Sequence, residues 1–342
     1  MYKALIRPLL FKLDPEFVHS LVVKLIKFVH YLPFGGLLLK KIFTFNNPSL
    51  KRNFLGLKFE NPVGLAAGFD KNAQYYKEFA NLGFSFIEIG TVTPKGQSGN
   101  PKKRSFRLPA DKALINRMGF NNKGVDEVVE NLKKRTDFSV IIGGNIGKNT
   151  LTPNEEAVND YITCFNKLYD YVDYFVVNVS CPNISNLHKL QDKDSLMEIL
   201  KAISNHRINK KIRKPVLLKI SPDLNFEQID DVLDIVNENQ IDGIVATNTS
   251  ISREGLITSK DVITNIGKGG LSGAPLKDRA TEIIRYISLK TNNQLPIIAV
   301  GGIFTKDDAI EKIEAGATLV QLYTGFIYEG PFLIKRICKS LV

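Results

Sequence analysis

Short apolar runs separated by helical stretches dominate the chain from about residue 54 onward. The runs are nearly continuous and rich in β-branched residues, which is typical of parallel strands buried on both faces. Between them, apolar residues recur at helical spacing, for example over 226–239 and 307–315. Eight strand–helix units predict an α/β fold that closes into one (β/α)8 TIM barrel. The predicted strands cover residues 62–67, 84–90, 140–146, 174–179, 215–220, 243–247, 297–300 and 318–323.

The first 45 residues follow the pattern of amphipathic helices instead. Asp14 followed by Pro15 predicts a helix start, because Asp is favoured at the N-cap and Pro in the first turn. Apolar residues then recur at helical spacing from Val18 to Val29, and a second apolar run covers 34–43. The pattern fits either a hairpin packed on the barrel or an interfacial membrane anchor. We expect a helical extension over residues 1–45 and a barrel over residues 46–342, with a polar hairpin or loop at 93–120 over one mouth.

The charge of the chain favours anionic partners. The 342 residues include 46 Lys and Arg against 35 Asp and Glu, a formal net charge of +11. Residues 1–41 hold seven of the basic residues and only Asp14 and Glu16 as acids, a local net charge of +5. Nucleic acid, an anionic membrane surface and anionic small molecules all fit this charge. We expect no membrane-spanning helix, since no run of about 18 uncharged apolar residues occurs, and no signal peptide.

Polar residues follow the predicted strands at the end where barrel active sites lie. Lysine and asparagine side chains gathered there would suit a planar, amide-rich anion. A role in capping the following helix explains any one of these residues well. It explains poorly why polar residues occur at all eight strand ends. The polar residues at the strand ends include Asp70, Lys71, Asn72, Thr91, Asn145, Asn178, Asn183, Lys219, Thr247, Asn248, Thr249, Tyr323 and Thr324.

Glycines cluster where barrels of this kind bind phosphate. Gly269, Gly270 and Gly273 form one group before the seventh strand. Gly301 and Gly302 end that strand, and Gly325 follows the eighth. Glycine lets backbone N–H groups approach a phosphate closely, so the clusters predict a phosphorylated cofactor. The chain contains neither a Walker-type motif nor a strand-linked GxGxxG motif, which argues against a nucleoside triphosphate or a Rossmann dinucleotide site.

The three cysteines do not form a disulfide or zinc framework, because their number is odd and their spacing wide. Cys164 and Cys338 lie in apolar helical patterns and are expected to be packed thiols. Cys181 follows the fourth predicted strand, where a thiol could act as a general base or a nucleophile. The four histidines lack metal-ligand spacing, so we expect no metal.

Six segments together resemble the FMN-dependent dihydroorotate dehydrogenases, and most closely the quinone-linked class 2 branch. Their order along nearly the whole chain makes the resemblance specific, and residues 1–45 resemble the helical extension of that branch. The segments are 61–71 (NPVGLAAGFDK), 88–94 (EIGTVTP), 115–122 (INRMGFNN), 144–149 (GNIGKN), 178–183 (NVSCPN) and 270–273 (GLSG).

The resemblance implies oxidation of dihydroorotate to orotate in pyrimidine biosynthesis, with FMN taking a hydride and Cys181 removing the neighbouring proton. Lys71 would pair with the substrate carboxylate, and Lys219 would stabilise negative charge on the reduced flavin. The residues implied for FMN are Ala67, Gly68, Thr91, Asn145, Asn178, Lys219, Thr247, Gly273, Gly302, Tyr323 and Thr324. The residues implied for the substrate are Lys71, Asn116, Arg117, Met118, Gly119, Phe120, Asn178, Asn183, Asn248 and Thr249.

The resemblance also implies partners and a location. A membrane quinone would accept the electrons through an apolar gap between the helices of residues 1–45, and this segment would bind an anionic lipid surface at the cytoplasmic face of the cell membrane. We expect no nucleic acid partner, and a monomer is plausible. Cys181 departs from the serine usual in the quinone-linked branch and matches the fumarate-linked class 1 branch. The alternatives are therefore a class 1-like enzyme, an FMN barrel acting on RNA as tRNA dihydrouridine synthases do, and a non-catalytic membrane-bound barrel.

Overall fold

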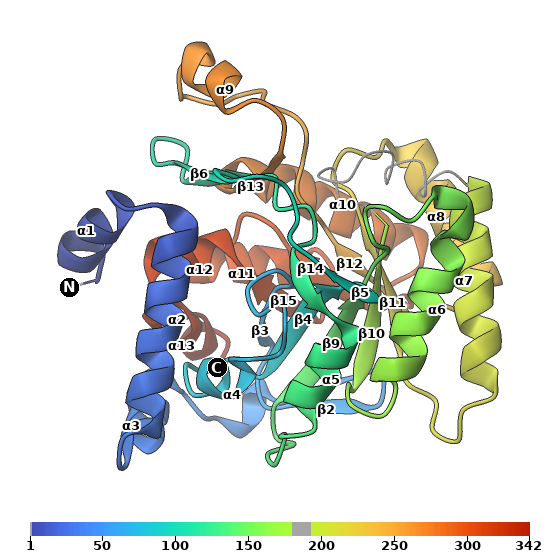
Figure 1. Cartoon of the computed structure of the whole chain (residues 1–342), viewed down its shortest axis with the longest axis horizontal. Helices are drawn as coiled ribbons and strands as arrows, with labels where there is room; N and C mark the ends of the chain where they lie inside the picture. The colour runs from blue at the N-terminus through green and yellow to red at the C-terminus, as the bar shows by residue number, and fades with distance from the viewer. Residues whose placement is uncertain (1, 180–192) are drawn as a thin grey trace.

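The chain folds around a closed barrel of eight parallel strands (Figure 1), which confirms the predicted (β/α)8 fold. The computed structural model describes residues 2–179 and 193–342. All eight predicted strands are present, and neighbours around the barrel follow chain order. The barrel strands are β3 (Val63–Leu65), β4 (Phe86–Val92), β9 (Ile141–Ile146), β10 (Tyr174–Asn178), β11 (Val216–Ile220), β12 (Gly243–Ala246), β14 (Ile297–Val300) and β15 (Leu319–Leu322).

Apolar side chains fill the end of the barrel where the strands begin. A short antiparallel hairpin, β1 (Arg52–Phe54) and β2 (Leu57–Phe59), closes the end opposite the active-site mouth. Phe59 packs edge-to-face against both Phe54 and Phe86, with ring centroids 6.1 and 5.2 Å apart. Edge-to-face packing of this kind stabilises aromatic clusters beyond their burial. Because this hairpin closes one end, the open mouth is at the other end of the barrel, where the strands terminate.

Helices surround the barrel and bury their apolar faces against it. Two of them begin with a reciprocal capping box, formed by Asn225 with Gln228 and by Thr305 with Asp308. The helices of the barrel part are α4 (Tyr76–Ala80), α5 (Val125–Leu132), α6 (Ala157–Leu168), α7 (Lys193–Ile208), α8 (Phe226–Glu238), α9 (Lys260–Ile266), α10 (Lys277–Lys290), α11 (Lys306–Glu314), α12 (Thr324–Glu329) and α13 (Phe332–Ser340), with 3-10 turns η2 (Pro48–Leu50), η3 (Asn154–Glu156) and η5 (Ala274–Leu276).

Two small antiparallel sheets lie at the mouth, as the polar insert predicted. The insert contributes β5 (Lys95–Gln97), β6 (Ser105–Leu108), β7 (Ala113–Asn116) and β8 (Asn122–Gly124). Strand β13 (Gly270–Gly273) pairs with β7 on the side away from β6, so part of the glycine segment that we read as a phosphate loop is a strand. The sheet of β6, β7 and β13 and the protruding α9 stand above the barrel (Figure 1). Residues of β7 and β13 form one wall of the mouth.

The N-terminal segment is helical and lies along one side of the barrel (Figure 1). It consists of η1 (Tyr2–Ile6), α1 (Arg7–Phe11), α2 (Pro15–Tyr31) and α3 (Gly35–Phe43). The Asp14 side chain accepts from the N–H groups of Glu16 and Phe17, which confirms the predicted N-cap of α2. Within residues 2–179 and 193–342, no single helix is long and apolar enough to cross a membrane, although α2 and α3 pass such a test as a pair bent by 114°.

Candidate active site

A polar cavity of about 140 Å³ opens at the mouth of the barrel, and most residues predicted for the site line it. Strand ends supply the floor, while β7, β13 and their connections supply the wall. Gly301, from the glycine pair predicted to approach a phosphate, lines it as well, and so do Leu276 and Gln321, which the sequence did not single out. The predicted residues on its surface are Ala67, Gly68, Lys71, Thr91, Asn116, Met118, Gly119, Phe120, Asn178, Lys219, Thr247, Asn248, Thr249, Gly273, Gly302, Tyr323 and Thr324.

Of the predicted residues that the structure describes, Asn145 and Arg117 do not line the cavity. Asn145 is fully buried beneath it, where its side chain supports Thr91. The Arg117 side chain points away, stacks on Phe106 at 4.6 Å, and donates to backbone carbonyls outside the cavity. Arg117 therefore contributes its backbone to this region, while its guanidinium braces the wall. The predictions for Cys181 and Asn183 lie outside the described residues.

Side-chain amides and a hydroxyl from β4, β9, β10 and the segment after β12 form a continuous hydrogen-bond network at the floor. Thr91 donates to Oδ1 of Asn145 at 2.6 Å, and Nδ2 of Asn178 donates to Oγ1 of Thr91 at 3.0 Å. Nδ2 of Asn248 donates to Oδ1 of Asn178 at 3.2 Å. Because each amide is held by its neighbours, the remaining donors and acceptors have defined directions. The network can recognise a planar heterocycle through directed hydrogen bonds.

A fully buried carboxylate, Glu88, organises the floor from within the barrel. It is 0% exposed, and its two oxygens accept from Nδ2 of Asn145 and Nε2 of Gln321, both at 2.7 Å. The ammonium group of Lys219 lies 3.6 Å from the same carboxylate. Buried charges persist only when they are paired and hydrogen-bonded. The sequence analysis did not select Glu88 or Gln321, although a carboxylate within the apolar strand at 86–89 was a usable signal.

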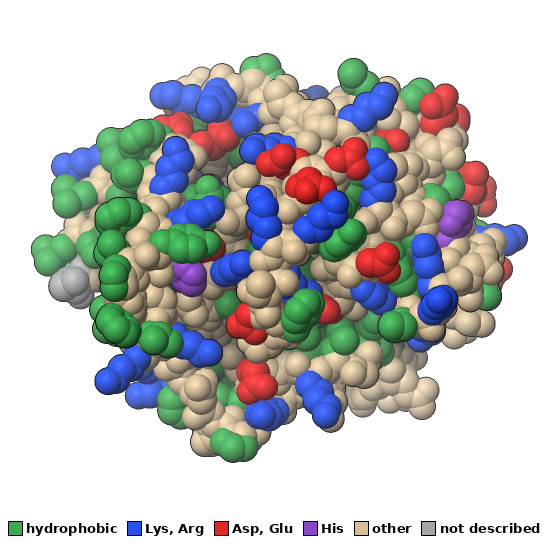
Figure 2. All heavy atoms as spheres, turned by 60° about the horizontal axis from the view of Figure 1, so that its bottom comes forward, with side chains coloured by type: hydrophobic (Ala, Val, Ile, Leu, Met, Phe, Trp, Pro, Cys, Tyr) green, Lys and Arg blue, Asp and Glu red, His purple; other side chains and the backbone are tan. Residues whose placement is uncertain are grey.

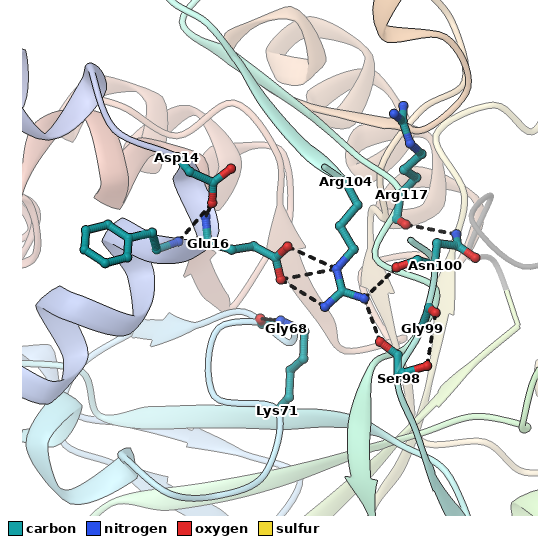
Figure 3. Close-up of polar contacts among 10 residues, drawn as sticks. Asp14, Glu16, Gly68, Lys71, Ser98, Gly99, Asn100, Arg104 and Arg117 are labelled. Atoms are coloured by element: carbon teal, nitrogen blue, oxygen red, sulfur yellow. Dashed lines mark hydrogen bonds and ion pairs between the residues drawn. The ribbon is translucent and has the colours of Figure 1, made fainter. Parts of the chain in front are cut away.

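Lys71 stands at the entrance to the cavity and carries a shifted pKa. Its Nζ donates to the carbonyl oxygen of Gly68 at 2.8 Å (Figure 3). Desolvation lowers the pKa of Lys71 to about 8, while the Glu16 carboxylate opposes this shift and Arg104 adds to it. An ammonium in a desolvated pocket gains more from an anionic ligand than one in water, because charge pairs are stronger at low dielectric. Lys71 is therefore placed to bind a carboxylate.

The glycine positions fit a large phosphorylated cofactor. Gly68 has a φ of +94°, a conformation that favours glycine, and a Cβ there would contact the Tyr323 ring at 3.5 Å. A Cβ at Gly302 would lie 2.3 Å from the Lys277 backbone, and one at Gly273 would lie 2.4 Å from the carbonyl oxygen of Lys112. Glycine is required where the backbone approaches so closely. Together with an ammonium and hydroxyl donors, this cradle suits a phosphorylated flavin.

A second cavity, of about 1020 Å³, lies between α2 and the barrel and joins the first. Five residues line both cavities: Gly68, Lys71, Asn116, Met118 and Tyr323. Its wall along the extension is largely apolar. Where the two cavities meet, burial holds the pKa of His19 down at about 4, with a further contribution from Lys71, and raises the pKa of Tyr323 to about 12. Both side chains are therefore neutral near pH 7, which suits an uncharged apolar ligand.

Cys164 and Cys338 are buried, which confirms that they are packed thiols. Burial raises the pKa of Cys338 to about 12 and that of Cys164 well above its usual value, so neither is a nucleophile. In the described part of the chain, no cluster of three His, Cys, Asp or Glu side chains could hold a metal ion.

Comparison with known proteins identifies the family. Residues 49–342 match the family model described as dihydroorotate dehydrogenase. The chain belongs to the dihydroorotate dehydrogenase family. It is 56% identical to a dihydroorotate dehydrogenase (quinone) from Christiangramia forsetii, across 100% of this chain and 99% of that protein. A protein of the same description from Acinetobacter baylyi is 46% identical, with both chains covered completely. Dihydroorotate dehydrogenases are flavin-dependent oxidoreductases.

Solved structures of the family have the same fold. Dihydroorotate dehydrogenase from Eimeria tenella in complex with ferulenol superposes with a TM-score of 0.86 at 38% identity, covering 96% of this chain and 90% of that one. The ligand-free form from the same organism gives the same TM-score and identity, with 94% of that chain covered. The alignment spans the extension as well as the barrel, since it leaves only 4% of this chain uncovered.

We predict that Glu88→Gln destabilises the barrel by about 1–3 kcal/mol, because the new NH2 group would face the amide donors of Asn145 or Gln321 in a dry interior. Chemical unfolding followed by circular dichroism would measure the loss. The matched control is Glu127→Gln, which removes an exposed carboxylate paired with Lys123 at 3.2 Å and should cost less than about 0.5 kcal/mol. Equal losses in the two variants would contradict the organising role of Glu88.

Proposed function

We propose that this chain oxidises dihydroorotate to orotate in pyrimidine biosynthesis, with FMN as the bound flavin and a membrane quinone as the final electron acceptor. The observation that carries the proposal is that a cavity with lysine, asparagine and threonine side chains on its wall meets a larger, mostly apolar cavity at Lys71 and Tyr323. The polar cavity suits a carboxylate-bearing amide ring, and the apolar cavity suits a hydrophobic acceptor. The family relationship supports the same reaction.

In this proposal the substrate and the flavin contact different residues of the site. Lys71 pairs with the carboxylate of dihydroorotate, and Asn116, Asn178 and Asn248 bind its ring amides, since a carboxamide both donates and accepts. The glycine segments ending at Gly273 and Gly302 hold the FMN phosphate. Lys219 lies beside the flavin ring, where its charge favours the reduced form. The backbone of residues 117–120 forms the remaining wall.

The reaction removes two hydrogens from neighbouring carbons of the substrate and leaves a double bond between them. Cys181 takes one of them as a proton, and FMN, when bound, supplies the acceptor for the other as a hydride. A quinone in the apolar cavity then receives two electrons and two protons to give the quinol, which balances the oxidation. A free thiol has a pKa of about 8.5 and deprotonates far more readily than a serine hydroxyl. In this proposal residue 181 therefore still acts as the base, but its side chain is more acidic than that of serine.

The alternatives to quinone-linked chemistry are less favoured. The relatives of this chain at 44–56% identity are described as dihydroorotate dehydrogenase (quinone), and they match across nearly their whole length. A fumarate-linked enzyme would leave the helical extension and its large apolar cavity without a purpose. An enzyme acting on RNA would need basic residues over an accessible groove, whereas nearly half of the excess charge here, +5 of +11, lies in the largely apolar helices of residues 1–41.

Residues 1–45 form the membrane segment in this proposal, and residues 46–342 form the catalytic barrel. Figure 2 shows hydrophobic side chains gathered over one side of the molecule, while the neighbouring face carries many charges. On α2 and α3, Leu21, Leu25, Phe28, Leu37 and Leu38 are 44–68% exposed. Such a patch, flanked by lysines, fits insertion into the surface of an anionic lipid leaflet. The protein would then lie on the cytoplasmic face of the membrane.

The first test is the visible spectrum of the purified protein under anaerobic conditions. We expect a flavin spectrum that dihydroorotate bleaches and that a quinone restores, whereas fumarate does not. Cys181→Ser should retain bleaching and Cys181→Ala should lose it while the flavin stays bound, because alanine cannot accept a proton. A colourless protein, or equal bleaching rates in all three proteins, would contradict this reading. Recovery with fumarate alone would assign class 1-like chemistry.

Orotate affinity should fall as the pH rises through the pKa of Lys71. With that pKa at about 8, the ammonium form predominates at pH 7 and is a minor species at pH 9. Apparent affinity scales with the competent fraction, so the Kd should rise about tenfold between these pH values. Titration of the flavin spectrum with orotate would measure it. Lys71→Gln should bind weakly at both pH values, and a pH dependence that persisted in this variant would assign the effect to another group.

Acidic substitutions on the exposed apolar face should weaken lipid binding. We expect the double variant Leu25→Glu, Phe28→Glu to bind anionic vesicles at least about tenfold more weakly, since each side chain loses its apolar transfer energy. Cosedimentation with vesicles would measure the loss. Ile257→Glu is the control, because Ile257 is 78% exposed but lies far along the chain beside α9. Equal binding by both variants would contradict the assignment of the lipid face to the extension.

A further inference from the structure

One ion pair with little exposure joins the helical extension to the wall of the substrate cavity. The Glu16 carboxylate, in the first turn of α2, accepts from Nε of Arg104 at 3.1 and 3.2 Å and from Nη2 at 3.0 Å (Figure 3). Arg104 is 7% exposed, and the Glu16 side chain is 19% exposed. Two guanidinium nitrogens on one carboxylate fix the orientation of both partners as well as their distance. The pair therefore sets where α2 stands relative to the loop of residues 98–104.

The same arginine holds that loop to the cavity wall. Nη1 of Arg104 donates to the carbonyl oxygens of Ser98 at 2.6 Å and Asn100 at 2.8 Å. Asn100 then donates from its backbone N–H to the carbonyl of Met118 at 3.2 Å, and from Nδ2 to the carbonyl of Arg117 at 2.9 Å. A continuous chain of hydrogen bonds thus runs from α2 to the backbone at 117–118.

Close packing restricts movement of the residues in this chain of hydrogen bonds. Gly99 has a φ of +72°, and a Cβ there would lie 2.1 Å from the Met118 carbonyl and 3.0 Å from Nη1 of Arg104. Beside it, Nε2 of Gln97 donates to the carbonyls of Gly119 at 3.0 Å and Phe120 at 3.2 Å. Interiors packed at this density transmit small displacements instead of absorbing them. A shift of Arg104 would therefore move the backbone that lines the substrate cavity.

We propose that Glu16 is a positioning residue for the substrate: through Arg104 it holds the backbone at 117–120 in its binding position, and so couples docking of the extension to binding of dihydroorotate or orotate. The identity of the ligand rests on the proposed function. Coupling between two sites is reciprocal, so a ligand held by this wall also stabilises the docked extension. The extension is then part of the substrate site as well as part of the acceptor site.

Electrostatics alone makes the opposite prediction, which allows a sharp test. Orotate is an anion, so replacing the Glu16 carboxylate by a neutral amide removes a repelling charge near Lys71 and leaves Arg104 as a net cation. At a pH well below the pKa of Lys71, which is about 8, the lysine stays protonated with or without the Glu16 charge. Under that condition, in which the comparison is made, a purely electrostatic effect would tighten orotate binding. A positioning effect weakens it, because the amide cannot hold the guanidinium through two acceptor oxygens.

The experiment compares Glu16→Gln with Glu329→Gln in the flavin-loaded full-length protein. Glu329 pairs with Lys3 of the extension and with Arg336 at 3.2 Å, so its loss also loosens the extension but removes no contact to residues 97–120. We expect the orotate Kd, measured by spectral titration of the flavin, to rise about tenfold in Glu16→Gln, a typical coupling between linked sites. The Kd in Glu329→Gln should stay within about twofold, below the usual coupling range. The limiting rate of flavin reduction at saturating dihydroorotate should be preserved in Glu16→Gln.

Tighter or unchanged orotate binding in Glu16→Gln would overturn the proposal, and so would an equal weakening in both variants. If Glu16→Gln does not fold, Glu16→Asp keeps the charge and shortens the side chain by one methylene. It should still weaken orotate binding and increase hydrogen exchange of the amides at 118–120, and unchanged values would overturn the proposal. A parent protein that holds no flavin, or whose flavin spectrum ignores orotate, would count against the proposed function instead.

Discussion

Closure of eight parallel strands into one hydrogen-bonded barrel is the constraint on which the rest of the molecule depends. Each strand must end at the same rim, so polar residues that lie far apart in the sequence meet there without any local contact between their segments. Closure also creates a dry interior that only a satisfied polar group can occupy, and Glu88 meets this condition through Asn145, Gln321 and Lys219. The barrel thus supplies both the rim that gathers the ligand contacts and the interior carboxylate that orders them.

The two cavities differ in the elements that build them and in the ligands that they suit. The polar cavity is built from strand ends whose positions the barrel fixes, while the apolar cavity exists only because α2 stands off from the barrel wall. Tyr323 and Lys71 belong to both, and on the apolar side the rings of Phe69 and His19 pack against each other with centroids 4.9 Å apart. A flavin held by the residues where the two cavities meet would be within reach of a ligand in either cavity, and it would supply the redox chemistry between them.

Much of this architecture could be predicted from the sequence, because its signals are local or periodic. The eight strands are continuous apolar runs, and the Asp14-Pro15 start of α2 is a short-range rule. Residues whose roles depend on distant partners were harder to predict. Glu88 and Gln321 are 233 residues apart in the sequence, and Arg104 and Glu16 are 88 apart. No sequence motif or periodic pattern therefore indicates either pair. Arg117 sits within a motif of cavity residues, yet tertiary packing turns its side chain the other way.

The acidic residues of the extension have a consequence for how the surface of the molecule is charged. Residues 1–41 contain only two carboxylates, and both take part in hydrogen bonds: Asp14 caps α2, and Glu16 holds Arg104. Lys12, Lys24, Lys40 and Lys41 remain exposed along the same helices. Glu16 is thus held in an ion pair with the barrel, whereas Asp14 and these four lysines stay exposed, so the surface of the folded extension carries more positive than negative charge. The acid that attaches the extension to the barrel is therefore also one that is removed from its outer surface.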